Sequence, residues 1–361
     1  MQRNAADSRN GHGLLPFVLT CLLTLPFLTL SGCGEDKEQV VTIDLTPWTL
    51  GFDAANDFYL VERNFYLSLL KFVPSKASYA LNGVIQPPGA GGFLPWGLEV
   101  ASGGAAADQV VFLTDVSDAN DTNRLLAVTP NIVDEPGLDA LLLAQTDGPA
   151  GAPFHELRAV ASLYWVDNSN PADPRKIHRV FVIDHDPEGE EKIQVADYDI
   201  EAATFTFDDP ITWAGAGTPE CPDVLVDPLG LAVDPDHNAL YVTDQRNDAV
   251  YRFSGIQQGG AVDCDQERTY WKNTEDLLNE PSGVAYLAGT VEPPQKNYIA
   301  VADSKNLRVT AFTWNGTDFV AENVPDNFVP FTGAAPFDLT FDQNEDLWAT
   351  YPNANAIAGP Q

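Results

Sequence analysis

Short runs of alternating apolar and polar residues recur along this chain, and turn residues bound each run. The clearest stretch is "PLGLAVDPDHNALYVTDQRNDAVYRF", residues 228–253, which contains three such runs. Alternation with a period of two residues indicates β-strands with one buried face. The stretch therefore predicts three antiparallel strands joined by tight turns.

The same pattern starts six times, each time with a proline, two variable residues and an apolar residue. The starts are Pro47, Pro95, Pro153, Pro228, Pro281 and Pro336, and the one at Pro153 carries one extra residue. The second runs are "FYLVE", "VFLTD", "VFVID", "LYVTD", "IAVAD" and "LWATY". Third runs follow in all copies, and fourth runs follow in all but the last, including "ERTYWKN" in the fourth copy. "QVVTIDL", residues 39–45, alternates in the same way and precedes the first copy.

Four-stranded units repeated at this spacing are typical of propellers. We therefore expect an all-β fold, a six-bladed β-propeller with four-stranded blades over residues 39–361. A ring that does not close leaves exposed strand edges. We expect the N-terminal strand at 39–45 to complete the last blade and close the ring.

The copies at 228–253 and 281–314 resemble the NHL repeat of six-bladed propellers. In that repeat the Asp that ends the second strand and the polar-basic turn after it recur. The resemblance is partial over the first, second and sixth copies. It is weakest over the third, where "NSNPADPRKIH" lengthens the first hairpin. It implies the fold and leaves the function open, because one fold hosts many activities.

Composition and charge limit the classes of molecule that this protein can bind. The 361 residues are 44% hydrophobic, which is normal for a globular chain. The formal net charge is −33, from 19 basic and 52 acidic residues. A surface this negative repels phosphate backbones, so we expect no nucleic-acid partner. The charge favours solubility, and we expect a monomer.

The N-terminus carries a targeting signal. Arg3 and Arg9 precede an apolar run over 14–30, which is short for a membrane span. The run ends in Leu30-Ser31-Gly32-Cys33, which resembles a bacterial lipobox. The resemblance implies cleavage before Cys33 and diacylation of that residue. An ordinary signal peptide with an incidental cysteine is the alternative.

These features predict a signal peptide over 1–32, a lipidated tether over 33–38 and a chain anchored in the bacterial envelope. Gly34 and Glu35 lack the Asp that often marks inner-membrane retention, which favours the outer membrane, facing the periplasm or the exterior. Cys221 and Cys264 are disulfide candidates, because the envelope is oxidising. Each lies in a long connection between blades, and the sequence leaves open whether they meet.

Acidic residues end five of the second strands, and we expect them to be structural. Their carboxylates can accept hydrogen bonds from the turn that follows, and nearby Arg or Lys residues can form ion pairs between blades. An acidic ring that binds a cation is the alternative. These residues are Glu62, Asp115, Asp184, Asp244 and Asp303.

The positions after each starting proline are candidates for a channel mouth, because the first strand of a propeller blade lines the central channel. The second position holds Trp48, Trp96, Phe154, Leu229, Ser282 and Phe337, and the third holds Thr49, Gly97, His155, Gly230, Gly283 and Asp338. Trp48, Trp96, Phe154, His155, Phe337 and Asp338 are candidates for a binding site there, with His155 opposite Asp338. Packing of the aromatic rings between blades is the alternative, and it is the one that we favour.

The same positions test an enzymatic function. Six-bladed proteins that resemble gluconolactonases and the regucalcin family hold a divalent metal with Glu, Asn and Asp, the Asn commonly in a Pro-Asn-Gly start. Leu229 and Ser282 occupy the matching positions here, and Leu is not a metal ligand. The NHL-like peptidyl-hydroxyglycine lyases need several channel histidines for zinc, and only His155 falls in a channel position.

We therefore expect a non-catalytic binding or scaffold module for a protein, peptide or glycan at the envelope, without a cofactor. The alternative is a divergent metal-dependent hydrolase or lactonase that uses His155, Asp338 and Glu99. Calcium at the oxygen-rich loop over 115–124 is a further alternative to a solvated turn.

Overall fold

The structure is a computed structural model of the chain. It describes residues 39–42, 46–53, 56, 58–62, 67–73, 78–85, 94–101, 108–117, 122–129, 142–186, 191–212, 225–257, 263–264, 278–289, 297–315, 319–322 and 333–359. The chain divides into two compact units, Met1–Cys33 and Gly34–Gln361, and every described residue belongs to the second. Within these residues no helix is both long and apolar enough to cross a membrane.

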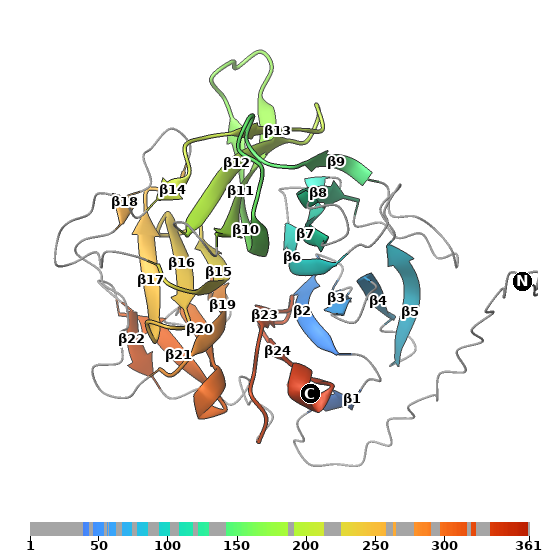
Figure 1. Cartoon of the computed structure of the whole chain (residues 1–361), viewed down its shortest axis with the longest axis vertical. Helices are drawn as coiled ribbons and strands as arrows, with labels where there is room; N and C mark the ends of the chain where they lie inside the picture. Colours follow the sequence, from blue (N-terminus) through green and yellow to red (C-terminus); the bar gives the residue numbers. More distant parts are fainter. Residues whose placement is uncertain are drawn as a thin grey trace, which may run out of the picture. The chain divides into compact units, whose positions relative to one another are not determined.

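The second unit is built from antiparallel sheets arranged as a propeller, with one sheet for each repeat except the first (Figure 1). The second repeat forms β6 (Pro95–Ala101), β7 (Val110–Ser117), β8 (Thr122–Val128) and β9 (Leu142–Thr146). The third forms β10 (Glu156–Asp167), β11 (Arg175–His185), β12 (Lys192–Asp199) and β13 (Thr204–Phe207), with β14 (Ile211–Thr212) also paired to β12. The fourth forms β15 (Pro228–Asp234), β16 (Ala239–Asp244), β17 (Ala249–Ser254) and β18 (Asp263–Cys264). The fifth forms β19 (Pro281–Leu287), β20 (Tyr298–Asp303), β21 (Arg308–Trp314) and β22 (Phe319–Glu322).

The first repeat departs from the prediction of six four-stranded blades. It forms two separate pairs, β2 (Pro47–Phe52) with β3 (Phe58–Glu62) and β4 (Leu67–Val73) with β5 (Ser78–Ile85). β3 and β4 lie next to each other, but no hydrogen-bond ladder joins them among the described residues. Among the described residues, five sheets rather than six therefore contain four or more strands. In the fourth repeat "ERTYWKN" lies outside the described residues, and β18 is the fourth strand instead.

The N-terminal strand completes the last sheet, as its position in the sequence predicted. β1 (Gln39–Thr42) pairs antiparallel with β25 (Ala356–Gly359), so that Gln39 lies opposite Gly359. β24 (Leu347–Tyr351) and β23 (Leu339–Phe341) continue this sheet toward the axis. Two short 3-10 turns, η3 (Ser304–Asn306) and η5 (Pro352–Ala354), follow the second strands of the fifth and sixth repeats.

The first strands of the repeats form an inner ring, which consists of β2, β6, β10, β15, β19 and β23. Each strand of the inner ring contacts the next, and β23 contacts β2, so the circuit is closed. A threonine hydroxyl bridges neighbouring inner strands at three places. Thr243 Oγ1, for example, accepts from Gly230 N at 2.8 Å and donates to Ser282 O at 2.5 Å. Thr114 and Thr350 make the equivalent bridges to Arg158 O and Trp48 O.

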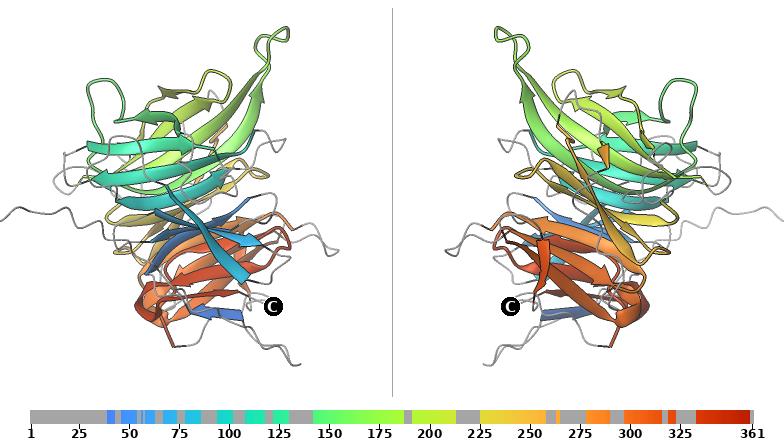
Figure 2. Two further views of the ribbon diagram at one scale, coloured as in Figure 1. Left: turned by 90° about the vertical axis from the view of Figure 1, so that its right-hand side faces the viewer. Right: turned by 90° about the vertical axis from the view of Figure 1, so that its left-hand side faces the viewer.

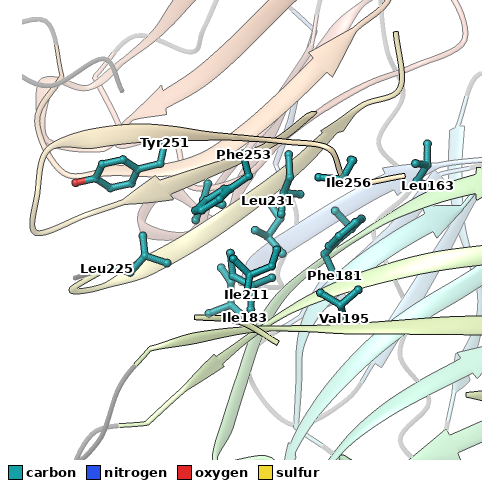
Figure 3. Close-up of a cluster of buried hydrophobic side chains, with 14 of the residues drawn as sticks. Leu163, Phe181, Ile183, Val195, Ile211, Leu225, Leu231, Tyr251, Phe253 and Ile256 are labelled. Atoms are coloured by element: carbon teal, nitrogen blue, oxygen red, sulfur yellow. The ribbon is translucent and has the colours of Figure 1, made fainter. Parts of the chain in front are cut away.

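Apolar side chains fill the seams between neighbouring sheets. Figure 3 shows the seam between the third and fourth sheets, where Phe181 and Ile183 of β11 face Leu231 of β15 and Phe253 of β17. Successive side chains of a strand point to opposite faces of the sheet, so each sheet packs against both of its neighbours. This packing holds the inner ring in place.

The first hairpin of the third repeat is longer than the others. β10 and β11 contain 12 and 11 residues, whereas β6 and β7 of the second repeat contain 7 and 8. Figure 2 shows this hairpin, in light green, reaching beyond the neighbouring sheets. It corresponds to the lengthened hairpin that the sequence indicated.

Candidate functional site

The acidic residues that end the second strands hold the segment that leads into the inner strand of the same repeat. Their carboxylates accept a hydrogen bond from a backbone N–H group shortly before the inner strand of the same sheet. Leu94 N donates to Asp115 at 3.0 Å, Val226 N to Asp244 at 2.8 Å and Asn279 N to Asp303 at 2.7 Å. The turn after the strand, which we expected to be the donor, contributes at Asp244 through Asn247 N.

The remaining two acids follow the same rule, and the ion pairs stay within sheets. His155 N donates to Asp184 at 2.8 Å, and Thr46 N to Glu62 at 3.4 Å. Arg124 pairs with Asp115, and Arg308 pairs with Asp303, as direct cross-strand neighbours. At Asp115 and Asp303 the ion pair thus joins two strands of one sheet, because each arginine lies opposite the acid in its own ladder.

The strand register places the start of the third repeat at Leu157, four residues after the Pro153 that the sequence pattern indicated. In four other repeats the starting proline pairs with the acid that ends the second strand, as Pro228 does with Asp244. In the third repeat Leu157, not Pro153, takes that place opposite Asp184. Arg158 therefore occupies the second position and Ala159 the third. A Cβ on Gly97 would meet Arg158 O and Ala159 Cα, just as one on Gly283 would meet the backbone of Phe337 and Asp338.

This register removes Phe154 and His155 from the inner ring. Phe154 is buried against Phe207 at 5.9 Å, in the seam between the second and third sheets. The His155 side chain is 47% exposed and lies 3.8 Å from Asp184 and 3.6 Å from Asp186. The contacts of His155 are thus local to the third sheet, while those of Asp338 lie on the first and sixth. The expected arrangement of His155 opposite Asp338 rested on the wrong alignment.

Arg158 is the residue that the sequence alignment missed at the ring. Its Nη1 donates to Asp227 at 2.5 Å and to Pro228 O at 3.1 Å, and its Nε lies 3.5 Å from Glu156. The arginine therefore links β10 to the start of β15, the inner strand of the fourth repeat. When Leu157 takes the place of the proline in "ELRAV", Val160 falls on the apolar position of the repeat. This match is the sequence signal that could have identified Arg158 as a residue of the inner ring.

The remaining aromatic residues form one cluster on one side of the ring. Trp48 is buried, with its ring 5.1 Å from Trp96 and 3.9 Å from Phe337. Leu98 and Val61 complete the same cluster. The alternative of packing between blades therefore holds for Trp48, whereas Trp96 and Phe337 are partly exposed.

Two carboxyl groups of the inner ring each reach across to the next strand. Glu99 on β6 accepts from Ser162 Oγ on β10 at 3.2 Å. Asp338, just before β23, accepts from Leu50 N on β2 at 3.1 Å. Inner strands present unpaired N–H groups toward the axis, and an acidic side chain is a suitable acceptor for them. Both side chains remain partly exposed.

The two carboxyl groups share one electrostatic environment. Burial raises the pKa of Glu99 to about 7, against the hydrogen bonds from Ser162, and the charge of Asp338 raises it further. Burial likewise raises the pKa of Asp338 to about 7, against hydrogen bonds from Leu50 N and Leu339 N. Of the proposed catalytic trio, Glu99 and Asp338 lie on the inner ring, whereas the contacts of His155 lie within the third sheet.

A metal site does not assemble from these residues. Within the described part of the chain, no three His, Cys, Asp or Glu side chains are grouped so that they could hold an ion. The loop beginning at Asp234 is a turn in which the carboxylate accepts from His237 N at 2.9 Å, and Asn238 adopts a positive φ of 51°. The calcium alternative at 115–124 lies partly outside the described residues.

Three cysteines of interest are not placed. Cys33 and Cys221 lie outside the described residues, and for Cys264 only the backbone, in β18, is described. The predicted lipidation and the predicted disulfide therefore stay predictions.

Comparison with known proteins shows the fold. No family model and no curated protein matches this sequence. A gluconolactonase from Xanthomonas campestris is similar in structure, with a TM-score of 0.53 and 13% identity over 90% of each chain. A luciferin-regenerating enzyme has a TM-score of 0.52 and 12% identity, over 88% of this chain and 89% of the other. An auxiliary nutrient binding protein from Bacteroides thetaiotaomicron has a TM-score of 0.52 and 11% identity, over 87% of this chain and 68% of the other. Identities this low show the β-propeller fold alone.

Proposed function

We propose that the chain is an envelope lipoprotein whose propeller binds a protein, peptide or glycan without catalysing a reaction. The observation that carries this proposal is the pair Glu99 and Asp338, two partly exposed carboxyl groups held by a rigid ring of strands. Carboxylates accept hydrogen bonds from hydroxyl, amide and ammonium groups. The proposed site therefore favours a ligand rich in donors, and Trp96 and Phe337 offer apolar surface beside it.

Small residues let the inner strands pack closely around the two carboxyl groups. The third positions of the second, third, fourth and fifth repeats are Gly97, Ala159, Gly230 and Gly283. A Cβ on Gly97, Gly230 or Gly283 would meet the backbone of the next strand at 2.3, 2.4 or 2.7 Å, so these positions hold the ring tightly. Binding-protein and enzyme neighbours share the fold, so the residues rather than the fold support the proposal.

We further infer that β2–β5 form a sixth sector of the propeller, as the resemblance to NHL repeats implies. β2 lies between β23 and β6 in the inner ring, which is the place that a sixth blade would fill. The threonine bridge from Thr350 Oγ1 to Trp48 O, at 2.9 Å, supports this position for β2.

The membrane anchor is part of the proposal. Lipidation at Cys33 would attach the chain, through the tether over 33–38, to the outer membrane. Replacing Cys33 with serine should release the protein into the soluble fraction, which fractionation and immunoblotting would measure. Membrane association that survives this substitution would refute the lipobox interpretation.

A second candidate function is hydrolysis of a lactone or ester. The observation that favours it is that burial raises the pKa of two carboxyl groups of the inner ring to about 7. Such groups can donate and accept protons at neutral pH. The metal-dependent form of this candidate lacks support, because the described residues do not group three ligands around Glu99 and Asp338.

One set of variants tests both candidates. Capture from envelope extracts at low and moderate salt should yield a specific partner for the wild type, and E99Q/D338N should lose it. His155→Ala serves as a matched control, because its contacts lie away from the pair. No specific partner at either salt concentration would count against binding. Lactone or ester turnover that D338N abolishes and His155→Ala retains would favour the enzyme.

A further inference from the structure

The extended hairpin of the third repeat carries a polar face that the proposed function does not use. Leu163 pairs with Arg179 where the equivalent pair of the second repeat, Ala101 with Val110, ends its ladder. The hairpin continues with Tyr164–His178, Trp165–Ile177, Val166–Lys176 and Asp167–Arg175. One side of this extension holds Trp165 and Asp167, because alternate residues of a strand share a face.

Two buried N–H groups on this side have no acceptor among the described residues. They are Nε1 of Trp165 and Nε of Arg179. The two residues are diagonal cross-strand neighbours, a separation that long side chains bridge. A buried donor without an acceptor costs roughly 1–3 kcal/mol, so native structures usually supply a partner. A group that pairs with these two N–H donors must therefore offer acceptor atoms.

Acceptors and hydroxyl groups surround these donors on the same face. Arg179 binds Asp197 at 3.4 Å and Asp208 at 2.6 Å through its two Nη atoms. Burial raises the pKa of the Asp197 carboxyl, against the charge of Arg179. Thr204 and Thr206 on β13 are exposed and lie opposite Asp199 and Asp197, which places them on this face.

We propose that this face, defined by Trp165, Arg179, Asp197, Thr206 and Asp208, binds the pyranose ring of a neutral glycan. A sugar hydroxyl accepts and donates at the same oxygen, so it can satisfy an N–H group and a carboxylate together. The C–H face of a pyranose is apolar and fits the partly exposed ring of Trp165.

Charge and strand pairing argue against other ligands. The face contains Asp167, Asp197, Asp199 and Asp208 against Arg175 and Arg179, so it repels an anion. An extended peptide that adds a strand would need a free strand edge. β10 is the end strand of this sheet, so an added strand would pair along the edge of β10 and would not cover the face that holds the two donors.

One exposed side chain on the same face can move when a ligand binds. Arg175 is 55% exposed and pairs with Asp167 at 2.8 Å and Asp199 at 3.7 Å on the same face. A side chain this exposed rearranges at small cost, because water replaces its hydrogen bonds. We therefore expect the indole N–H of Trp165 to change its environment when a sugar binds.

Indole resonances of the full-length protein, labelled with ¹⁵N at tryptophan, test the proposal. The probes are maltohexaose and the tetramer of N-acetylglucosamine, and Trp165→Phe assigns the resonance. We expect a saturable shift of the Trp165 indole with at least one probe. Trp165→Phe, which removes one hydrogen bond and keeps a ring, should weaken binding about three- to tenfold, and Trp165→Ala should weaken it further. Val166→Ala, on the opposite side of the hairpin, is the control and should bind as the wild type does.

Several results would overturn the proposal. These are no shift with either sugar, equal affinity in Trp165→Phe and Trp165→Ala, or a shift with an extended peptide alone. A water resonance that exchanges magnetisation with the Trp165 indole, without any effect of sugar, would show that an internal water is the missing acceptor. E99Q/D338N should leave the saturable shift of the Trp165 indole unchanged, whatever it does at the inner ring, so failure here is distinguishable from failure of the proposed function.

Discussion

Replacing Glu99 with glutamine should change how the stability of the propeller depends on pH. Glutamine keeps the shape of the side chain and an oxygen that can accept from Ser162 Oγ, but it cannot ionise. Glu99 in the folded protein has a pKa of about 7, compared with an ordinary value of 4.5. The unfolded chain therefore releases this proton at lower pH than the folded chain does.

The sign and size of the effect follow from this difference. A carboxyl whose pKa is raised on folding stabilises the protein fully below its unfolded pKa and loses that contribution as pH rises through the folded pKa. At about 1.36 kcal/mol for each pKa unit, the wild type should lose roughly 2 to 3 kcal/mol at this site between pH 5 and pH 8. Most of that loss should fall below pH 7.

Urea denaturation followed by circular dichroism at pH 5, 6, 7 and 8 measures the effect. The free energy of unfolding of Glu99→Gln should rise relative to the wild type by roughly 2 to 3 kcal/mol across this range. Other acids titrate in both proteins, so the difference between the two curves isolates this site. Glu201→Gln, at an exposed turn, is the control and should run parallel to the wild type. A constant separation between Glu99→Gln and wild type would show that Glu99 ionises normally and that the reasoning is wrong.

Three further substitutions test the inner ring and the entries to the sheets by the same urea measurement. Thr243→Val should cost roughly 1–3 kcal/mol, because the N–H of Gly230 loses its acceptor; a cost no larger than that of the exposed Thr206→Val would contradict this. Gly230→Ala should cost roughly 1–3 kcal/mol, because the new Cβ would lie 2.4 Å from Ser282 O, and an unchanged midpoint would mean that the seam can widen freely. Asp303→Asn should cost roughly 2 kcal/mol, because an amide nitrogen or a neutral oxygen then faces Asn279 N and Arg308; stability equal to the wild type would remove the role of this acid.

Most of the fold could be predicted from the sequence because its signals are local. Short, mainly apolar runs marked β3, β16 and β24 at "FYLVE", "LYVTD" and "LWATY", and these strands are buried along their whole length. The unpaired run before the first repeat indicated the closing strand, which pairs with β25. Neither signal depends on how distant parts of the chain meet.

The candidate site was only partly predictable. Glu99 and Asp338 were named from the sequence, but their shared environment depends on two strands that lie far apart in the chain. Ser162 and the bridging threonines carried no signal of their own, because a hydroxyl on a strand is common. Their roles appear only when neighbouring inner strands are in contact.

By itself, the sequence determined the repeated strands and the strand that closes the ring. Tertiary structure alone decided that Leu157 rather than Pro153 starts the third inner strand, which removed His155 from the ring. It also decided that β2–β3 and β4–β5 pair separately. The physical reason is that periodicity is set by each residue's own neighbours, whereas register is set by hydrogen bonds between strands and by the packing of whole sheets.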